Sequence, residues 1–421
     1  MSAVEDRVRQ LHATGLLRAA AGSGTPDPAA VGPGRPVAGG PFDPAATGAR
    51  RPEDGGTSVS GADGPVGPVV GVVGGDVPVE IIEACGARPF RLSAAEREPG
   101  AEAVGLLGAA VDSVFHSILD RILAGEFGFL RGLVVSRDCQ GSLRLFYVLR
   151  MLAEQGRGVP EVHLVDLLHL PRESTRDYNA GQLAKLAEVV AGWTGIAVTP
   201  DSLYEARKAR GRLAAGLRDL RARRAAGAVP GALALRVYAL AQTETPADCL
   251  AVLDAVLGGA PAVWSPQGRP RVFLTGSTVD QVSVYDRLEA AGVLIAGEDH
   301  NWGDPVADLW DEHPEPLDLP SACTAIAAHR LRHGPMASTS GLSDRARFSA
   351  AGIRRCGAEL VLSVARRNDP APGWDRPGLI RELGPDARVV ALSVAAHTWS
   401  ADEFGTATAL LTREDREATA R

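Results

Sequence analysis

Short apolar runs alternate with longer amphipathic stretches along most of the chain. The apolar runs lie at residues 69–73, 88–92, 133–135 and 162–166, and again at residues 271–276, 293–295, 359–364 and 386–394. Such continuous runs are typical of buried parallel strands. Apolar residues at helical spacing fill segments between them, for instance residues 113–125 and 345–356. Strands that alternate with helices in two separate blocks predict an α/β fold with two Rossmann-like parallel-sheet domains.

A long helical segment separates the two blocks. Its apolar spacing predicts helices over residues 180–195, 202–226 and 232–257, broken at Gly195, Pro200 and Pro230. The middle helix is rich in basic residues, which we interpret as a solvated helix surface rather than a ligand site. These residues are Arg207, Lys208, Arg210, Arg212, Arg218, Arg221, Arg223 and Arg224.

The N-terminal part of the chain differs in composition from the rest. Residues 1–20 include apolar positions at helical spacing, whereas residues 21–67 are dominated by Gly, Pro, Ala and Asp without periodicity. That composition is typical of a disordered linker. The predicted division is an N-terminal helix (1–20), a linker (21–67), a first α/β domain (68–179), a helical segment (180–265) and a second α/β domain (266–421).

Composition narrows the classes of partner. The 421 residues include 44 basic and 51 acidic side chains, with a formal net charge of −7. The sequence has no Lys/Arg-rich run of the kind that binds a phosphate backbone, so nucleic acid is not an expected partner. No apolar stretch approaches the length of a membrane span, and residues 1–15 lack the order of a signal peptide. We therefore expect a cytoplasmic protein with no membrane partner. The five cysteines are widely spaced, without a CxxC pair, and predict neither a disulfide framework nor a zinc ribbon.

The stretch RGLVVSRDCQGS, residues 131–142, is a short apolar strand that ends on a polar turn carrying Cys139. In an open α/β sheet, ligands bind outside the carboxyl ends of the strands. Residues 143–149 predict a following helix, whose N-terminal amides would favour the thiolate form of Cys139. The alternative is that Cys139 is a small buried core residue.

Two further polar loops follow predicted strands, at residues 297–304 and at residues 367–370. If the two sheets face each other, these loops and Cys139 converge in one interdomain cleft, the usual place for a cofactor or substrate. Asp299 and His300 fit an acid/base group or a carboxylate–histidine metal pair, or else loop residues that bond their own backbone. The residues expected to line the cleft are Ser277, Asp299, Asn301, Asn368 and Asp369.

Four stretches occur in a recognisable order. They are VPVEIIEACGARPFRL (77–92), GLVVSRDCQGSLRLFYVLR (132–150), YNAGQLAKLAEVVAGWTGIAVTPDSLYEARKARGR (178–212) and RVFLTGSTVDQVSVYDRLEAAGVLIAGEDHNWGD (271–304). Together they resemble the 2-hydroxyacyl-CoA dehydratase family, which includes benzoyl-CoA reductase subunits and the D-component type of 2-hydroxyglutaryl-CoA dehydratase. The ordered set carries the resemblance, because no single motif in it is specific by itself.

The resemblance implies an iron-sulfur subunit of two Rossmann-like domains, usually paired with a homologous subunit. In such proteins three cysteines hold a 4Fe-4S cluster in the interdomain cleft. The resemblance also implies an acyl-CoA or other acyl thioester substrate and a separate ATP-dependent activator protein. The activator supplies one electron, the thioester is reduced to a ketyl, and the hydroxyl group is expelled.

The ligand positions depart from this pattern. Cys139 falls on the first cysteine of the family, but Asn301 stands where the second is expected and Asn368 where the third is expected. A neutral carboxamide is a poor ligand for cluster iron, so we do not expect a three-cysteine cluster in this chain. An unusual cluster or metal site that uses Cys139, His300 and an external or partner ligand stays open. We assign the other cysteines to packing, namely Cys85, Cys249, Cys323 and Cys356.

Three functions are compatible with the sequence. The first is a diverged subunit of a dehydratase-type lyase that works with a homologous, cluster-bearing subunit. The second is a non-catalytic partner that completes the active-site cleft or docks the activator. The third is a cluster-free protein that reuses the cleft, with Asp299, His300 and Asp369 as its polar groups.

Overall fold

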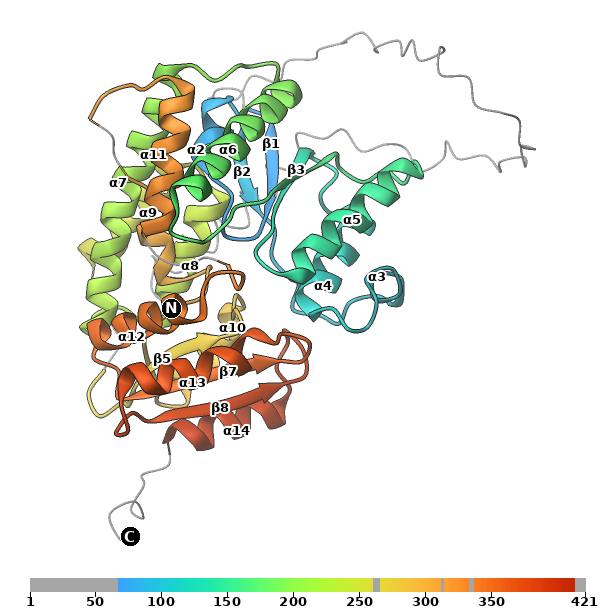
Figure 1. The fold of residues 1–421 in the computed structure, drawn as a ribbon. Coiled ribbons are helices and arrows are strands. Elements are labelled where there is room, and N and C mark those ends of the chain that lie inside the picture. The colour runs from blue at the N-terminus through green and yellow to red at the C-terminus, as the bar shows by residue number, and fades with distance from the viewer. Residues whose placement is uncertain (1–66, 260–265, 312–313, 333–336, 413–421) are drawn as a thin grey trace.

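The computed structural model describes residues 67–259, 266–311, 314–332 and 337–412. The predicted N-terminal helix, and all but the last residue of the predicted linker, lie outside the described residues. Within the described chain, two four-stranded parallel sheets are covered by helices (Figure 1). The predicted α/β fold with two parallel-sheet units is confirmed. The exact domain boundaries stay predictions.

The first sheet has the strand order β2-β1-β3-β4, and every neighbouring pair is parallel. Its strands are β1 (Val69–Val73), β2 (Arg88–Arg91), β3 (Leu130–Ser136) and β4 (Val162–Val165). All five residues of β1 are buried because helices cover both faces of the sheet. One face packs on α2 (Val79–Ala84), α6 (Glu173–Thr194) and α11 (Leu319–Arg332), and the other on α3 (Ala101–Leu107), α4 (Ser113–Leu123) and α5 (Gln140–Glu154).

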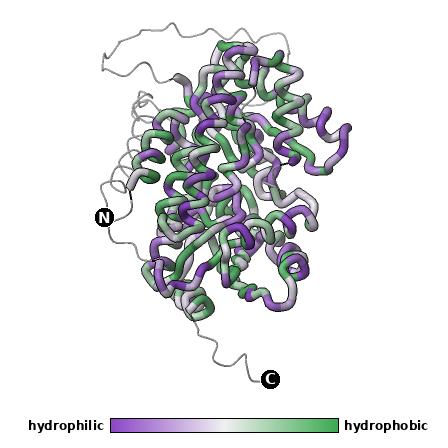
Figure 2. The backbone as a smooth tube through the Cα atoms, turned by 90° about the vertical axis from the view of Figure 1, so that its left-hand side faces the viewer, coloured by the Kyte–Doolittle hydropathy of each residue, from purple (hydrophilic) through white to green (hydrophobic). Residues whose placement is uncertain are grey.

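The second sheet repeats this arrangement with the order β6-β5-β7-β8, again entirely parallel. Its strands are β5 (Arg271–Gly276), β6 (Leu294–Glu298), β7 (Leu360–Arg366) and β8 (Val389–Val394). One face packs on α8 (Gly231–Thr243), α10 (Val282–Ala290) and α14 (Ala401–Thr412), and the other on α12 (Leu342–Cys356) and α13 (Ala371–Leu383). Along the backbone, hydrophobic and hydrophilic stretches alternate accordingly (Figure 2).

A third core lies between helices α7 (Pro200–Ala225), α8 and α9 (Pro246–Gly258) and the 3₁₀ helix η2 (Asp304–Asp308). The prediction of one helix over residues 232–257 is wrong, because α8 ends at Thr243 and α9 begins at Pro246. Proline cannot donate an intrahelical hydrogen bond, and it occupies the first turn of the new helix, where no bond is needed. The Thr245 side chain caps that helix by accepting a hydrogen bond from the Asp248 amide at 3.2 Å.

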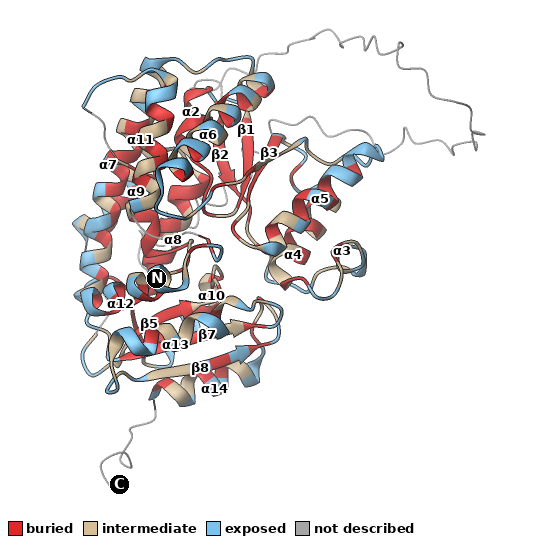
Figure 3. Cartoon of the chain, viewed as in Figure 1, coloured by how far each residue is buried: buried red, intermediate tan, exposed pale blue. Residues whose placement is uncertain are grey.

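The interpretation of α7 as a solvated basic surface is wrong for three of its arginines. Arg207, Arg210 and Arg224 are buried, with at most 3% of each residue exposed, and α7 alternates buried and exposed positions (Figure 3). Each forms an ion pair with a carboxylate outside α7, at 2.8, 2.6 and 2.6 Å respectively. Burial of these charges is tolerated because each is paired and hydrogen-bonded.

In each sheet the strand order reverses once, because the first strand along the chain has later strands on both of its sides. The loops at these two reversal points position the site. In the first sheet the reversal lies between β1 and β3, and in the second between β5 and β7. The loops at the carboxyl ends of such strands diverge and leave a crevice for ligands. The β3 loop carries Asp138 and Cys139, and the β7 loop carries Asn368 and Asp369.

Candidate functional site

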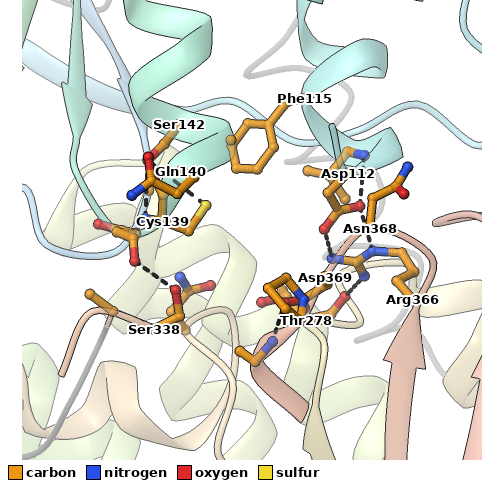
Figure 4. A pocket seen from close by; sticks show the side chains of 18 of the residues that line it. Asp112, Phe115, Cys139, Gln140, Ser142, Thr278, Ser338, Arg366, Asn368 and Asp369 are labelled. Atoms are coloured by element: carbon orange, nitrogen blue, oxygen red, sulfur yellow. Dashed lines mark hydrogen bonds and ion pairs between the residues drawn. The ribbon is translucent and has the colours of Figure 1, made fainter. Parts of the chain in front are cut away.

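A cavity of about 1180 Å³ lies where the loops of the two sheets meet. Its wall combines Asp138 and Cys139 of the first unit with Asp280, Asp299 and Asn368 of the second. Figure 4 shows Cys139 and Asn368 on opposite sides of this cavity. Cys139, Asp299, His300, Asn301, Asn368 and Asp369 all line it, whereas Ser277 does not.

Cys139 is the N-cap residue of α5 and is partly buried. Its backbone amide donates to Ser142 Oγ at 3.3 Å, and Ser142 Oγ donates back to the Cys139 carbonyl at 3.0 Å. Burial raises the pKa of the Cys139 thiol to about 12, and the negative charges of Asp138 and Asp369 add to this effect. The amides of Ser142 and Gly141 at the start of α5 do lower the pKa, as predicted, but the cost of burying the charge exceeds this stabilisation and the thiol form is favoured.

Asp138, immediately before Cys139, was not selected from the sequence. Its Oδ2 accepts a hydrogen bond from the Gly75 amide at 2.6 Å, and its Oδ1 accepts one from the Ser136 hydroxyl. Burial and the charge of Asp76 raise the pKa of Asp138 to about 7. Gly74 permits this close approach, since its φ is +98° and a Cβ there would lie 2.6 Å from Asp138 Oδ2. The signal in the sequence was a carboxylate on the same strand-exit turn as Cys139.

His300 is buried, and both of its ring nitrogens are engaged. Nδ1 accepts a hydrogen bond from the Trp302 amide at 3.4 Å, so in the neutral ring Nε2 carries the proton and donates to Tyr285 Oη at 2.8 Å. The Tyr285 hydroxyl in turn donates to Glu298 Oε2 at 3.0 Å. Burial and the positive charge of Arg224 lower the pKa of His300 to about 3. His300 is therefore neutral at physiological pH.

A buried ion-pair network fixes the loop that carries His300. Arg224 donates from Nη1 to Glu298 Oε2 at 2.6 Å, and its Nη2 lies 2.6 Å from Asp304 Oδ1. The Tyr238 hydroxyl donates to the same Asp304 oxygen at 2.7 Å. Arg224 and Glu298 side chains are fully buried. Because both ends of the loop are anchored, its central residues are held in one conformation.

Asn301 contacts the first sheet through Arg91 at the end of β2. Arg91 Nη2 donates to Asn301 Oδ1 at 2.8 Å, and Arg91 Nη1 donates to the Asn301 carbonyl at 2.5 Å. The Arg91 guanidinium also lies 4.3 Å from the ring centre of Trp302. The carboxamide at the second expected ligand position thus joins the two units.

Asn368 makes a second contact between the units. It has a φ of +70°, and its Nδ2 donates to the carbonyls of Ala109 and Val111 at 2.8 and 3.2 Å. Beside it, Arg366 forms a bidentate pair with Asp112, at 2.8 Å from Nε and 2.9 Å from Nη2. These bonds join the β7 end to the segment between α3 and α4.

The remaining predicted residues are held by hydroxyl groups. Ser277 is buried beside the cavity and donates to Asp369 Oδ2 at 2.6 Å. Asp299 Oδ2 accepts a hydrogen bond from Thr275 Oγ1 at 2.7 Å and another from Ser349 Oγ. Burial raises the pKa of Asp299 to about 6. Asp299 and Asp138 therefore bring to one cavity two carboxyl groups that titrate close to neutral pH.

Two opposed parallel sheets, with the loops of both reversal points around one polar cavity, define a two-unit Rossmann-like α/β protein with its site between the units. The family model described as 2-hydroxyglutaryl-CoA dehydratase, D-component, matches residues 75–396, and the chain belongs to this family. No curated protein matches the chain. Among the described residues, no helix has the length and apolar character needed to cross a membrane.

The residues present do not fit the cluster that this family implies. In the part of the chain that the structure describes, no group of three or more His, Cys, Asp or Glu side chains could hold a metal ion. Asn301 and Asn368 are bonded to the opposite unit, and both His300 nitrogens are engaged. Among the described residues that line the cavity, Cys139 is the one cysteine, and its sulfur is the kind of ligand atom that cluster iron prefers. The remaining cysteines are buried, as expected for packing: Cys85, Cys249, Cys323 and Cys356.

Proposed function

We propose that this chain is a cluster-free subunit of a 2-hydroxyacyl-CoA dehydratase-like lyase that acts on an acyl-CoA or other acyl thioester. In this proposal a homologous subunit carries the full 4Fe-4S cluster, and an ATP-dependent activator reduces it. The observation that supports the cluster-free role is the bonding of Asn301 and Asn368 across the cleft. These carboxamides take the place of two thiolates and join the two units through hydrogen bonds instead of through a metal centre.

The deciding experiment is anaerobic purification of the chain, alone and co-expressed with a three-cysteine homologue, with iron and sulfide counted in each. We expect no stoichiometric iron in the isolated chain. In the complex we expect iron that is unchanged by Cys139→Ser in this chain. Gln140→Ala is the matched control, because Gln140 is an exposed neighbour on the same cavity wall.

Stoichiometric iron in the isolated chain that is lost in Cys139→Ser, but kept in Gln140→Ala, would contradict the proposal. It would restore a metal site built on Cys139 with ligands from outside the chain. Failure to form any complex with the homologue would instead favour the cluster-free protein that reuses the cleft. Asp138 and Asp299 support that second candidate, because carboxyl groups that titrate near neutrality suit acid/base chemistry.

A further inference from the structure

Two side chains on the cavity wall carry buried polar atoms that have no hydrogen-bond partner within the described residues. Asp280, in the loop between β5 and α10, lines the cavity, and its Oδ1 is buried without a hydrogen bond. Ser340, just before α12, lines the same cavity with only 7% of the residue exposed, and its hydroxyl also lacks a partner. Buried polar atoms without partners are costly, so two of them on one cavity mark a place where a ligand supplies the missing bonds.

Arg91 brings a buried positive charge to the same cavity. Its terminal nitrogens bind neutral oxygens of Gln242 and Asn301, and its Nε has no partner. Arg366 and His397 lower the pKa of Asp280 more than Arg91 does, and Asp138 raises the pKa of Arg91 more than Asp280 does. The described chain contains no ion pair between Arg91 and Asp280. A cation and an anion therefore face one cavity without neutralising each other directly.

The charges of the wall carry both signs. Arg366 is paired with Asp112, and Arg345 is paired with Asp375 at 2.6 Å. Arg144 and Arg376 also line the cavity, as do Asp138, Asp299 and Asp369, so the wall as a whole favours neither sign of ligand charge. Asp280 Oδ1 is different, because it is a buried carboxylate oxygen that accepts no hydrogen bond within the described residues, and an ammonium group is a strong donor to such an oxygen.

We propose that this part of the cavity binds the head of an amino-acid-type ligand, with its ammonium group at Asp280 and its carboxylate or carbonyl oxygen at Arg91 Nε. The Ser340 hydroxyl supplies a further hydrogen bond. A ligand with only one of the two groups leaves the other buried charge without a partner. This inference goes beyond the proposed function, because it requires neither a cluster nor a second subunit.

Isothermal titration calorimetry of the full chain with three matched probes tests the proposal. The probes are L-2-aminobutyrate, L-2-hydroxybutyrate and butyrate, which differ only at the second carbon. We expect the amino acid to bind at least about tenfold more tightly than the other two, and Asp280→Asn to abolish that preference. Asp402→Asn, at an exposed carboxylate of α14, is the matched control and should keep the preference.

Equal binding of the three probes, tighter binding of the hydroxy acid, no binding, or an unchanged preference in Asp280→Asn would each overturn the proposal. A second measurement needs no ligand. Asp280 Oδ1 and the Ser340 hydroxyl have no hydrogen-bond partner within the described residues, and burial raises the pKa of Asp280 more than the charges of Arg366 and His397 lower it. Asp280→Asn and Ser340→Ala should therefore leave the melting temperature of the free protein unchanged or raise it. A fall relative to Asp402→Asn would assign these residues to structure. Neither measurement depends on iron or on a second subunit, so a result that overturns this proposal can be distinguished from one that overturns the proposed function.

Discussion

The ion pair between Arg366 and Asp112 gives the sharpest test of how the two units are joined. Both residues are buried, with 6% and 9% exposed, and two hydrogen bonds of 2.8 and 2.9 Å connect them. Asp112→Ala leaves a buried guanidinium without its counter-charge, which costs about 3–5 kcal/mol. It also removes the N-cap of α4, where Asp112 accepts from the Val114 amide at 3.3 Å, for about 1 kcal/mol more.

Urea denaturation, followed by tryptophan fluorescence and by far-ultraviolet circular dichroism, measures this loss. We expect Asp112→Ala to lower the free energy of unfolding by about 4 kcal/mol or more. The matched control is Asp344→Ala, which breaks an exposed pair with Arg347 and should cost no more than about 1 kcal/mol.

The double variant Asp112→Ala with Arg366→Met separates the ion pair from simple loss of packing. It should be more stable than Asp112→Ala alone, because it removes the unpaired buried charge. A loss below about 1 kcal/mol in Asp112→Ala, or a double variant less stable than the single one, would refute the reasoning. In that case water would be reaching the pair, and the junction between the units would be open.

Three further predictions concern the site. Gly74→Ala should destabilise the protein by more than Gly156→Ala, measured by thermal melting, because both glycines have positive φ but only at Gly74 would a Cβ meet other atoms. The raised pKa of Asp138 means that the folded state holds a proton that the unfolded state releases, so stability should fall as the pH rises from about 4 to 7. Asp138→Asn should flatten this slope in melting curves across that range. An unchanged slope would mean that another group causes the pH dependence. Tyr285→Phe removes the hydroxyl between His300 and Glu298 and should cost about 1–3 kcal/mol in urea denaturation, whereas a neutral effect would show that water replaces it.

The strand pattern could be read from the sequence because continuous apolar runs have few other uses in a globular protein. Residues 69–73 and 271–276 were expected as strands, and both are central strands in the structure. The break before Pro246 was missed, because the apolar residues of α8 and α9 continue across it at compatible spacing. The burial of Arg224 was missed because its two carboxylate partners lie far away in the sequence.

The candidate functional site, too, could be predicted from the sequence only in part. The sequence pointed to the strand-exit loops with Cys139, Asp299 and Asn368, because polar residues that end apolar strands gather at one edge of a parallel sheet. It could not select Asp280 or Arg91, since neither belongs to a motif. Their importance depends on which of their atoms lack partners after folding, and that is a property of packing alone.

By itself, the sequence determined the fold class and the family, and it predicted that Asn301 and Asn368 stand where two cysteines are expected. These follow from local patterns and from residue identity, which need no coordinates. Only the tertiary structure decided that both carboxamides bond to the opposite unit, that the Cys139 thiol is protonated and that His300 is neutral. The physical reason is that hydrogen-bond partners and desolvation are set by residues distant in the sequence, which are brought together only when the two sheets face each other.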